Sequence, residues 1–415
     1  MDFALSPHAE SLLERLRAFL AREVVPVEDE ILSTRARHCA GPHWRTWQDS
    51  PLVAKLQAKA RTAGLWNLFL ADSQFGAGLA NLDYAPLAEA MGWSVLAPEI
   101  FNCNAPDSGN MEVLLHHGTA AQQERWLRPL LAGEIRSAFC MSEPGVASSD
   151  PTNLAATLRV EGDELVLSGR KWWATGLGHP RCEIGLFVGV SNPEADRHHR
   201  HSLALVPLDS PGVNIIRMLP CLGEFDPPAG HGEVEFDRVR VPRANLIGEP
   251  GQGFAIAQGR LGPGRVHHCM RAIGAAERAF ALMVRRSRER SAFGRPLSDL
   301  GGNRERIGDL RIAIDGARLQ VLHAAWKLDQ AGARGARGEI SAIKVVVPAM
   351  LQRVADEAIQ LFGGAGLTND LPLTACFGMA RALRIADGPD AVHRDLIAKL
   401  ELRKYDPPAA SGRKV

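Results

Sequence analysis

The chain has 415 residues, of which 46% are hydrophobic and 23% are charged, and its formal net charge is +1. This length is too great for one simple core, so we expect about two or three packed units. The balance of 48 basic and 47 acidic residues argues against a protein that binds nucleic acid or an acidic membrane surface.

Cysteine usage and hydropathy indicate where such a protein works. Seven cysteines are dispersed between Cys39 and Cys376 without a Cys-x-x-Cys pair, which favours reduced thiols over disulfides or a zinc site. No apolar run is long enough to span a bilayer, and the start Met1-Asp2-Phe3-Ala4 has neither a basic region nor an apolar signal segment. We therefore expect a cytoplasmic protein that does not enter a membrane.

Helical periodicity dominates residues 5–135. A first helix is expected to open at Ser6 or Pro7 and to present leucines on one face, and Pro51 is expected to start a second. The Thr-x-x-Gln opening at Thr119 is typical of a capping box.

Residues 153–241 have a different sequence pattern, with β-branched residues, turn signals and a hydrophobic period near two. Glu161-Gly162-Asp163 is a hairpin signal between two such runs. The spacing predicts an antiparallel barrel or sandwich. The expected strands are 154–160, 164–167, 182–190, 202–208, 213–216 and 232–236.

Helical periodicity returns near residue 252. The run Gly262-Pro263-Gly264 predicts that a helix starts or breaks there. The order of helices, strands and helices predicts an α+β fold, divided into an N-terminal helical domain at 1–135, a β domain at 136–245 and a C-terminal helical domain at 246–415. The main C-terminal helices are expected at 265–290, 303–331, 338–361 and 390–403.

Glycine-rich and histidine-rich stretches have ordinary explanations. Neither Gly248-x-x-Gly251-x-Gly253 nor Gly363-Gly364-x-Gly366 lies between a strand and a helix, so loop glycines are favoured over a dinucleotide-binding site. His198, His199 and His201 fall in a polar turn, where a solvated loop is favoured over a metal site. His267 and His268 are adjacent on a helix and are expected at its surface or at an interface. No metal site is predicted.

Two stretches contain candidate functional residues. Between Phe139 and Thr175, two hydroxyl-rich loops frame a hairpin, and Trp173 could pack against a flat ring, although a core position would also explain it. Asp387 lies in a Gly-Pro turn just before a helix, where a capping role is the alternative, but Asp390 competes for that role.

Taken together, four motifs in order resemble the acyl-CoA dehydrogenase superfamily of flavoproteins over nearly the whole chain, most closely the subgroup of family members 10 and 11 and their bacterial relatives. They are Met141-Ser142-Glu143-Pro144, Lys171-Trp172-Trp173-Ala174-Thr175, Arg290-Ser291-Ala292-Phe293-Gly294 and Gln360-Leu361-Phe362-Gly363-Gly364.

The resemblance implies two helical domains enclosing an antiparallel β-barrel domain, with a four-helix bundle as the C-terminal domain, and it implies noncovalent FAD. Arg265 matches a position that contacts the acyl-CoA, and Ser148 is expected at both the cofactor and the acyl-CoA. The residues that match flavin-binding positions are Phe139, Met141, Ser142, Trp173 and Thr175. The residues that match positions contacting the FAD of a neighbouring subunit, which implies a homodimer or homotetramer, are Arg290, Phe293, Gln360 and Gly364.

The family reaction is α,β-dehydrogenation of an acyl-CoA thioester to the trans-2-enoyl-CoA, as in fatty acid β-oxidation, with electrons passed to an electron-transfer flavoprotein. A carboxylate in a dry pocket is a stronger base for the weakly acidic α-carbon. Asp387 matches the usual catalytic Glu, but its reach is about 1.5 Å shorter. Further departures are Pro389 in place of a Thr, Gly301 in place of a Gln, and Gly264 where another branch of the family places its base.

Two other functions remain open at this point. A nitroalkane-oxidising branch of the superfamily also uses an Asp base, so the same fold could serve a flavin oxidase. A DNA-associated member of the superfamily provides a model for a non-catalytic binding protein, although the near-neutral charge does not favour it. The length and branching of an acyl substrate depend on pocket shape, which the sequence does not specify.

Overall fold

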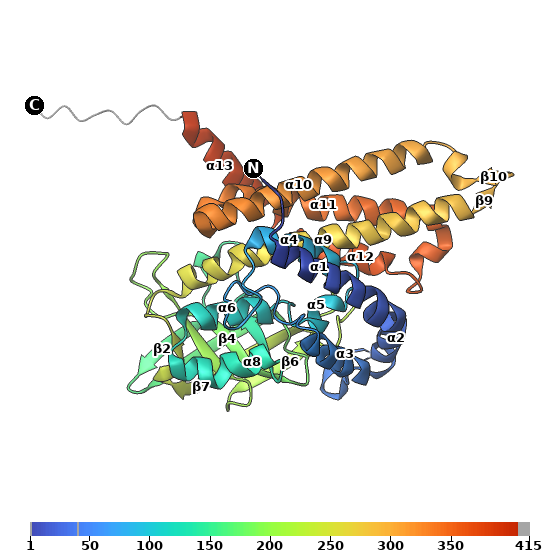
Figure 1. The fold of residues 1–415 in the computed structure, drawn as a ribbon. Helices are drawn as coiled ribbons and strands as arrows, with labels where there is room; N and C mark the ends of the chain where they lie inside the picture. Colours follow the sequence, from blue (N-terminus) through green and yellow to red (C-terminus); the bar gives the residue numbers. More distant parts are fainter. Residues whose placement is uncertain (1, 40, 406–415) are drawn as a thin grey trace, which may run out of the picture. The chain divides into compact units, whose positions relative to one another are not determined.

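A computed structural model describes residues 2–39 and 41–405 of the chain (Figure 1). The chain forms two compact units, Met1–Arg278 and Ala279–Val415. The boundary falls inside the long helix α9, Gly253–Glu289.

The first unit begins with helices whose ends follow the sequence signals. Ser6 caps α1, with its side chain accepting a hydrogen bond from the Ala9 N–H, and the leucine face of α1 is buried. Thr119 and Gln122 form the expected capping box. These helices are α1 (Pro7–Phe19), α2 (Glu28–His38), α3 (Pro51–Thr62), α4 (Asn81–Met91), α5 (Ala97–Ile100), α6 (Asp107–His117), α7 (Ala120–Gln122) and α8 (Arg128–Ala132).

An eight-stranded sheet follows in the same unit. Its strands are β1 (Arg136–Cys140), β2 (Thr157–Glu161), β3 (Glu164–Thr175), β4 (Cys182–Val190), β5 (His201–Pro207), β6 (Val213–Met218), β7 (His231–Pro242) and β8 (Leu246–Ile247). The order along the sheet is β6-β7-β3-β2-β4-β5-β8, with β1 paired to β4. The predicted hairpin is present, because β2 and β3 pair in antiparallel register around Gly162.

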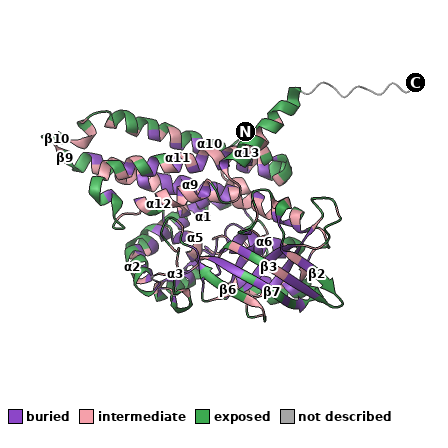
Figure 2. Ribbon diagram, turned by 180° about the vertical axis from the view of Figure 1, so that it is seen from behind, coloured by how far each residue is buried: buried purple, intermediate pink, exposed green. Residues whose placement is uncertain are grey.

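The sheet is antiparallel except where β4 pairs with β1 and with β2, and both of those pairs are parallel. Within the described residues, no strand pair joins β6 to β8, so the hydrogen bonding does not close a ring. The buried faces of the strands form the core (Figure 2), in which the rings of Phe187 and Phe236 meet edge to face at 4.8 Å.

The break expected at Gly262-Pro263-Gly264 is wrong, because α9 continues through Pro263. A proline ring inside a helix collides with the carbonyl one turn earlier, here that of Gly259.

The second unit is helical. A short hairpin of β9 (Ser291–Ala292) and β10 (Arg295–Pro296) follows α9. Helix α11 then packs against α10, α12 and α13. The sequence did not indicate α12. The bounds are α10 (Asn303–Gly335), α11 (Arg337–Phe362), α12 (Leu373–Leu383) and α13 (Asp390–Leu402).

Three polar residues lie in other surroundings than expected. His201 is buried as the first residue of β5 rather than solvated in a loop. His267 is buried at 3% exposure, with its ring edge-on to Tyr84 at 4.9 Å. Asp390 does not cap α13 but pairs with Arg384 at 2.8 Å. The contact of His267 with Tyr84 joins segments distant in sequence, whereas the pair of Asp390 with Arg384 is local.

The described helices include none that combines the length and the apolar character needed to cross a membrane.

Candidate functional site

A buried ion pair joins the hydroxyl-rich loop after β1 to strand β3. Lys171 Nζ on β3 lies 2.7 Å from Glu143 Oε1 and also donates to the Met141 carbonyl at 2.9 Å. The same carboxylate accepts the N–H groups of Ala155 and Ala156. Burial lowers the pKa of Lys171, and the Glu143 carboxylate opposes that shift. The pair therefore holds the loop after β1 against β3. Both residues belong to the four sequence motifs, but the sequence did not indicate that they pair.

Two further hydrogen bonds fix the hydroxyl-rich loop. The Ser142 carbonyl accepts the Trp172 N–H at 2.9 Å, and the Ser148 hydroxyl accepts the Glu143 N–H at 2.9 Å. The side chains of Met141, Ser142 and Ser148 are half-buried. Ser148 thus closes the loop on itself, which is a structural role in addition to any contact with a ligand.

Trp173 lies at an irregularity in the sheet. The register between β3 and β7 shifts between Lys171 and Ala174, which is a β-bulge. Trp173 has φ +52°, a left-handed conformation that is costly for a bulky residue, and its side chain remains 43% exposed. A core position for Trp173 is therefore wrong, since the bulge turns its ring away from the core.

Thr175 ends β3 beside a histidine. Its Oγ1 lies 2.9 Å from His231 Nδ1, and His231 Nε2 lies 3.7 Å from Asp226 Oδ2. The rings of His231 and Trp173 are 5.6 Å apart. The exposed indole and the half-buried hydroxyl therefore form one continuous patch.

Phe139, the remaining flavin-motif residue on β1, is covered by a cation. The Arg260 guanidinium of α9 lies 4.2 Å from its ring centroid, and Arg260 also donates to the Asn110 side chain. Arg265, expected at the acyl-CoA, is half-buried and lies five residues further along the same helix. The structure thus places all the predicted residues of the first unit on β1, β3, the loop after β1, and α9.

In the second unit, Asp387 occupies a tightly held turn. It is half-buried with φ +55°. Lys344, 1% exposed, donates to the carbonyls of Leu383 at 2.7 Å and Ala386 at 2.9 Å. His393 Nε2 lies 3.3 Å from the Asp387 carbonyl. A buried lysine and a buried histidine therefore fix the backbone on both sides of the carboxylate.

The other predicted residues of this unit lie at the ends of α9 and α11. Arg290 is exposed, and Phe293 is 95% exposed at the tip of the β9–β10 hairpin with φ +51°. Gln360 and Gly364 are exposed at the end of α11. The Arg286 guanidinium lies 5.3 Å from the Phe362 ring, so the two segments meet.

The patch in the first unit fits FAD. A planar tricyclic ring with polar edges needs an exposed aromatic face and hydroxyl or amide partners. Trp173 supplies the face through a strained bulge, while Ser142 and Thr175 supply the polar groups. Strain of this kind in the backbone persists where the surrounding structure maintains it, and it is frequent at ligand sites.

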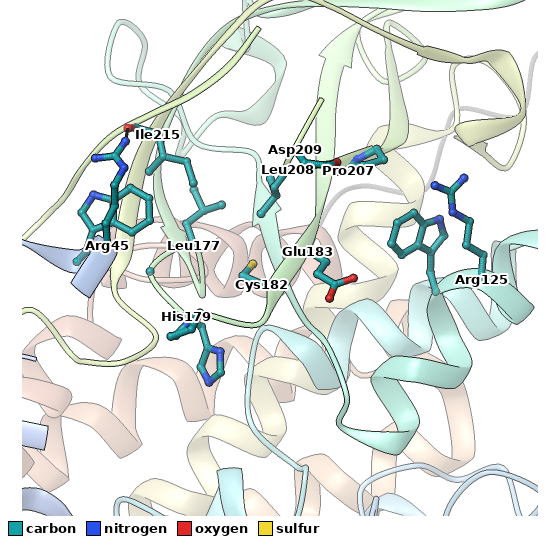
Figure 3. A pocket seen from close by; sticks show the side chains of 14 residues that line it. Arg45, Arg125, Leu177, His179, Cys182, Glu183, Pro207, Leu208, Asp209 and Ile215 are labelled. Carbon is teal, nitrogen blue, oxygen red and sulfur yellow. Dashed lines mark hydrogen bonds between the residues drawn. The ribbon is translucent and has the colours of Figure 1, made fainter. Parts of the chain in front are cut away.

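A pocket of about 780 Å³ is a separate feature of the first unit (Figure 3). Arg45 and Arg125 lie on opposite sides of it, and its lining contains none of the predicted site residues. Near its wall, Asp49, Glu99 and His179 cluster. However, Arg35 pairs with both carboxylates and, against the opposing effect of burial, holds the pKa of Glu99 at about 2. Arg35 therefore already occupies both carboxylates of this cluster.

Family models match three consecutive segments of the chain. Residues 6–134 match the acyl-CoA dehydrogenase N-terminal domain, 138–239 the middle domain and 251–402 the C-terminal domain. The chain belongs to the acyl-CoA dehydrogenase family. This membership confirms the resemblance seen in the four sequence motifs.

Similar proteins agree with that placement. The chain is 51% identical over 404 residues to acyl-CoA dehydrogenase family member 10 of Mus musculus, covering 96% of this chain but 37% of that protein. It is 50% identical over 405 residues to the probable acyl-CoA dehydrogenase FadE2 of Mycobacterium tuberculosis, covering 97% and 98% of the two chains. The expected subgroup is thereby confirmed. The chain spans only about a third of the mouse protein.

Solved structures give the same fold. A structure described as an acyl-CoA dehydrogenase from Mycobacterium abscessus has a TM-score of 0.94 and 57% identity, covering 97% of this chain and 100% of that one. An FAD complex of PigA, at 23% identity and a TM-score of 0.81, shares the fold alone. Family membership supports FAD as the cofactor and an oxidoreductase as the type of enzyme.

Proposed function

We propose that the protein dehydrogenates an acyl-CoA thioester to the trans-2-enoyl-CoA, with Asp387 as the base that removes the α-proton. The observation that carries this proposal is the turn at Asp387, a half-buried carboxylate in a left-handed conformation. Lys344 and His393 hold the carbonyls of Ala386 and Asp387. A turn kept in a strained conformation by two buried side chains is typical of a preorganised functional group.

Asp387 would remove the α-proton within hydrogen-bond reach of the substrate carbon, so the position of its backbone decides the reaction geometry. The shorter side chain of Asp makes this fixation more important than it would be for Glu. FAD, when bound, would accept the β-hydride. The enolate oxygen needs hydrogen-bond donors, and the N–H of Asp387 itself is one candidate on this chain.

Other residues would bind and orient the reactants. Trp173, Ser142 and Thr175 would hold the cofactor together with Phe139 and Met141, while Ser148 and Arg265 would contact the acyl-CoA. The exposed aromatic tip at Phe293, with Arg290, Gln360 and Gly364, would contact the FAD of a second subunit, so we infer a homodimer or homotetramer. We also propose an electron-transfer flavoprotein as the electron acceptor, a place in fatty acid β-oxidation, and a cytoplasmic location.

The domain division proposed for this reaction is 1–135, 136–245 and 246–415. In this division, the β domain carries most of the cofactor residues. The last domain carries the base.

A substrate panel tests the function. Purified protein with FAD is assayed with acyl-CoA thioesters of different length and branching, using a dye as the electron acceptor. Asp387→Asn should lower the rate by about 10²-fold or more, because an amide cannot accept the proton. Asp395→Asn, which alters an exposed carboxylate paired with Lys399 on α13, is the matched control.

Equal rates for wild type and Asp387→Asn would overturn the assignment of the base. Release of hydrogen peroxide in stoichiometric amount would instead indicate oxidase chemistry on the same fold.

A further inference from the structure

The cluster of Thr175, His231 and Asp226 has a geometry that the family assignment does not require. His231 is the first residue of β7 and pairs with Thr175 at the end of β3. One ring nitrogen, Nδ1, faces the Thr175 hydroxyl at 2.9 Å, and the other, Nε2, faces the Asp226 carboxylate at 3.7 Å. The histidine thus connects a candidate cofactor contact to a charged group nearer to solvent.

The surrounding backbone holds this cluster in place. Gly230 donates to the Asp226 carbonyl at 2.8 Å, and the Gly230 carbonyl accepts the Gly176 N–H at 3.0 Å. Asp226 itself has φ +52°, a left-handed conformation that Asp adopts more readily than a bulky residue such as Trp173. The loop that carries Asp226 is therefore bonded to the chain immediately after Thr175.

The carboxylate selects a tautomer of the histidine. A neutral imidazole carries one proton. At 3.7 Å the Asp226 carboxylate is too far from Nε2 for a hydrogen bond, but its negative charge favours the proton on that nitrogen. The proton then lies on Nε2, so Nδ1 is an acceptor. In the neutral ring, His231 therefore accepts the hydrogen bond from the Thr175 hydroxyl.

This hydrogen bond determines what Thr175 offers to a ligand. When its proton is donated to Nδ1, Thr175 Oγ1 presents only lone pairs. When the ring is protonated, Nδ1 donates to Oγ1 and the hydroxyl proton becomes available to another acceptor. The same side chain is thus a hydrogen-bond acceptor in one state and a donor in the other.

We propose that His231 is a positioning residue that sets the hydrogen-bonding direction of Thr175 toward the FAD, with Asp226 selecting the tautomer. This inference rests on the proposed cofactor role of Thr175. Its direct consequence is that replacing His231 or Asp226 changes the environment of the bound flavin.

Few other charged groups lie near His231. On β7, Glu233 is two residues away, but Arg170 and Arg217 already pair with it at 2.8 Å and 2.7 Å. Thr175 and the Trp173 ring, both on β3, face the histidine. Asp226, in the loop before β7, also faces it. Asp226, 65% exposed, is therefore the charged partner whose removal alters His231 most directly.

Nuclear magnetic resonance of the FAD-bound protein with ¹⁵N-labelled histidine tests the tautomer. Above the titration of the ring, the wild type should show His231 protonated at Nε2. Asp226→Asn should increase the fraction protonated at Nδ1. A His231 that carries its proton on Nδ1 in the wild type would overturn the inference.

The affinity for FAD, measured by isothermal titration calorimetry, tests the consequence. His231→Asn places an amide near the position of Nδ1 and should bind FAD within about threefold of the wild type. His231→Leu removes the partner of Thr175 and should weaken FAD binding by about tenfold.

His38→Asn, which changes an exposed histidine at the end of α2, is the matched control and should behave as wild type. An FAD affinity in His231→Leu equal to that of the wild type would overturn the inference alone. A wild type that binds no FAD would overturn the proposed function as well.

Discussion

Lys171 Nζ lies 2.7 Å from Glu143 Oε1, and only 0% and 7% of the two side chains are exposed. Removing one member of a buried pair leaves an uncompensated charge. Lys171→Met should therefore lower the free energy of unfolding by about 3–5 kcal/mol, measured by urea denaturation.

Lys59→Met provides the contrast, because Lys59 and Glu23 form an exposed pair with 59% and 33% of their side chains accessible. Lys59→Met should lower the free energy of unfolding by about 1 kcal/mol or less. The double variant Lys171→Met/Glu143→Gln should recover part of the stability. A cost for Lys171→Met no larger than that of the surface pair would contradict the structural role of the pair.

Trp173→Leu should weaken FAD binding by about tenfold or more, because the indole offers its exposed face to the ring system. Stability of the cofactor-free protein should change little, since the side chain is 43% exposed. Isothermal titration calorimetry measures the affinity. Trp93→Leu is the control, because the Trp93 side chain is 38% exposed. An equal loss of FAD affinity in both variants would contradict the role of Trp173.

Lys344→Met should reduce kcat more than FAD affinity. The change leaves the carbonyls of Leu383 and Ala386 without their donor, and the turn that carries Asp387 loosens. Exchange of the substrate α-proton with D₂O, followed by mass spectrometry, reports the proton-removal step by itself. Lys399→Met, on the exposed side of α13, should leave the exchange rate unchanged.

His267 should make stability fall in acid. Burial, with Arg271 and His268 nearby, lowers the pKa of His267 to about 3 from its ordinary value of 6.5. Between these values the unfolded chain binds a proton that the folded chain does not, so the free energy of unfolding falls as pH decreases, by about 1.4 kcal/mol per pH unit.

The variant His267→Phe retains the aromatic contact with Tyr84 without a titrating group. Urea denaturation at pH 7, 6 and 5 should show a shallower loss of stability than in the wild type. An identical pH dependence in both proteins would contradict the assignment.

Phe293→Asn should dissociate the oligomer without weakening the hairpin. Phe293 and Gly294 both have positive φ, and Asn-Gly is the favoured pair for a two-residue turn of that kind. Sedimentation velocity measures the assembly. Leu222→Asn replaces another exposed residue with positive φ and should leave the assembly intact. A Phe293→Asn protein that stays assembled would argue against this interface.

Local chemistry explains which elements could be predicted. The cap at Ser6, the capping box at Thr119 and the turn at Gly162 each depend on residues within a few positions of one another. Strand β4 was predicted at its observed bounds, 182–190. By contrast, β3 extends to Thr175, eight residues beyond the prediction, because its pairing with β7 maintains it.

The sequence by itself determined the order of helices, strands and helices and the four motifs that indicate the family, because both are written in short runs of residues. Only the tertiary structure decided that a bulge exposes Trp173. It also decided that Lys171 pairs with Glu143, 28 positions away in the sequence, and that His231 contacts Thr175, 56 positions away. These relationships depend on strand register and burial, which contacts between distant segments set. The candidate cofactor residues could therefore be named from the sequence, whereas the side chains that position them could not.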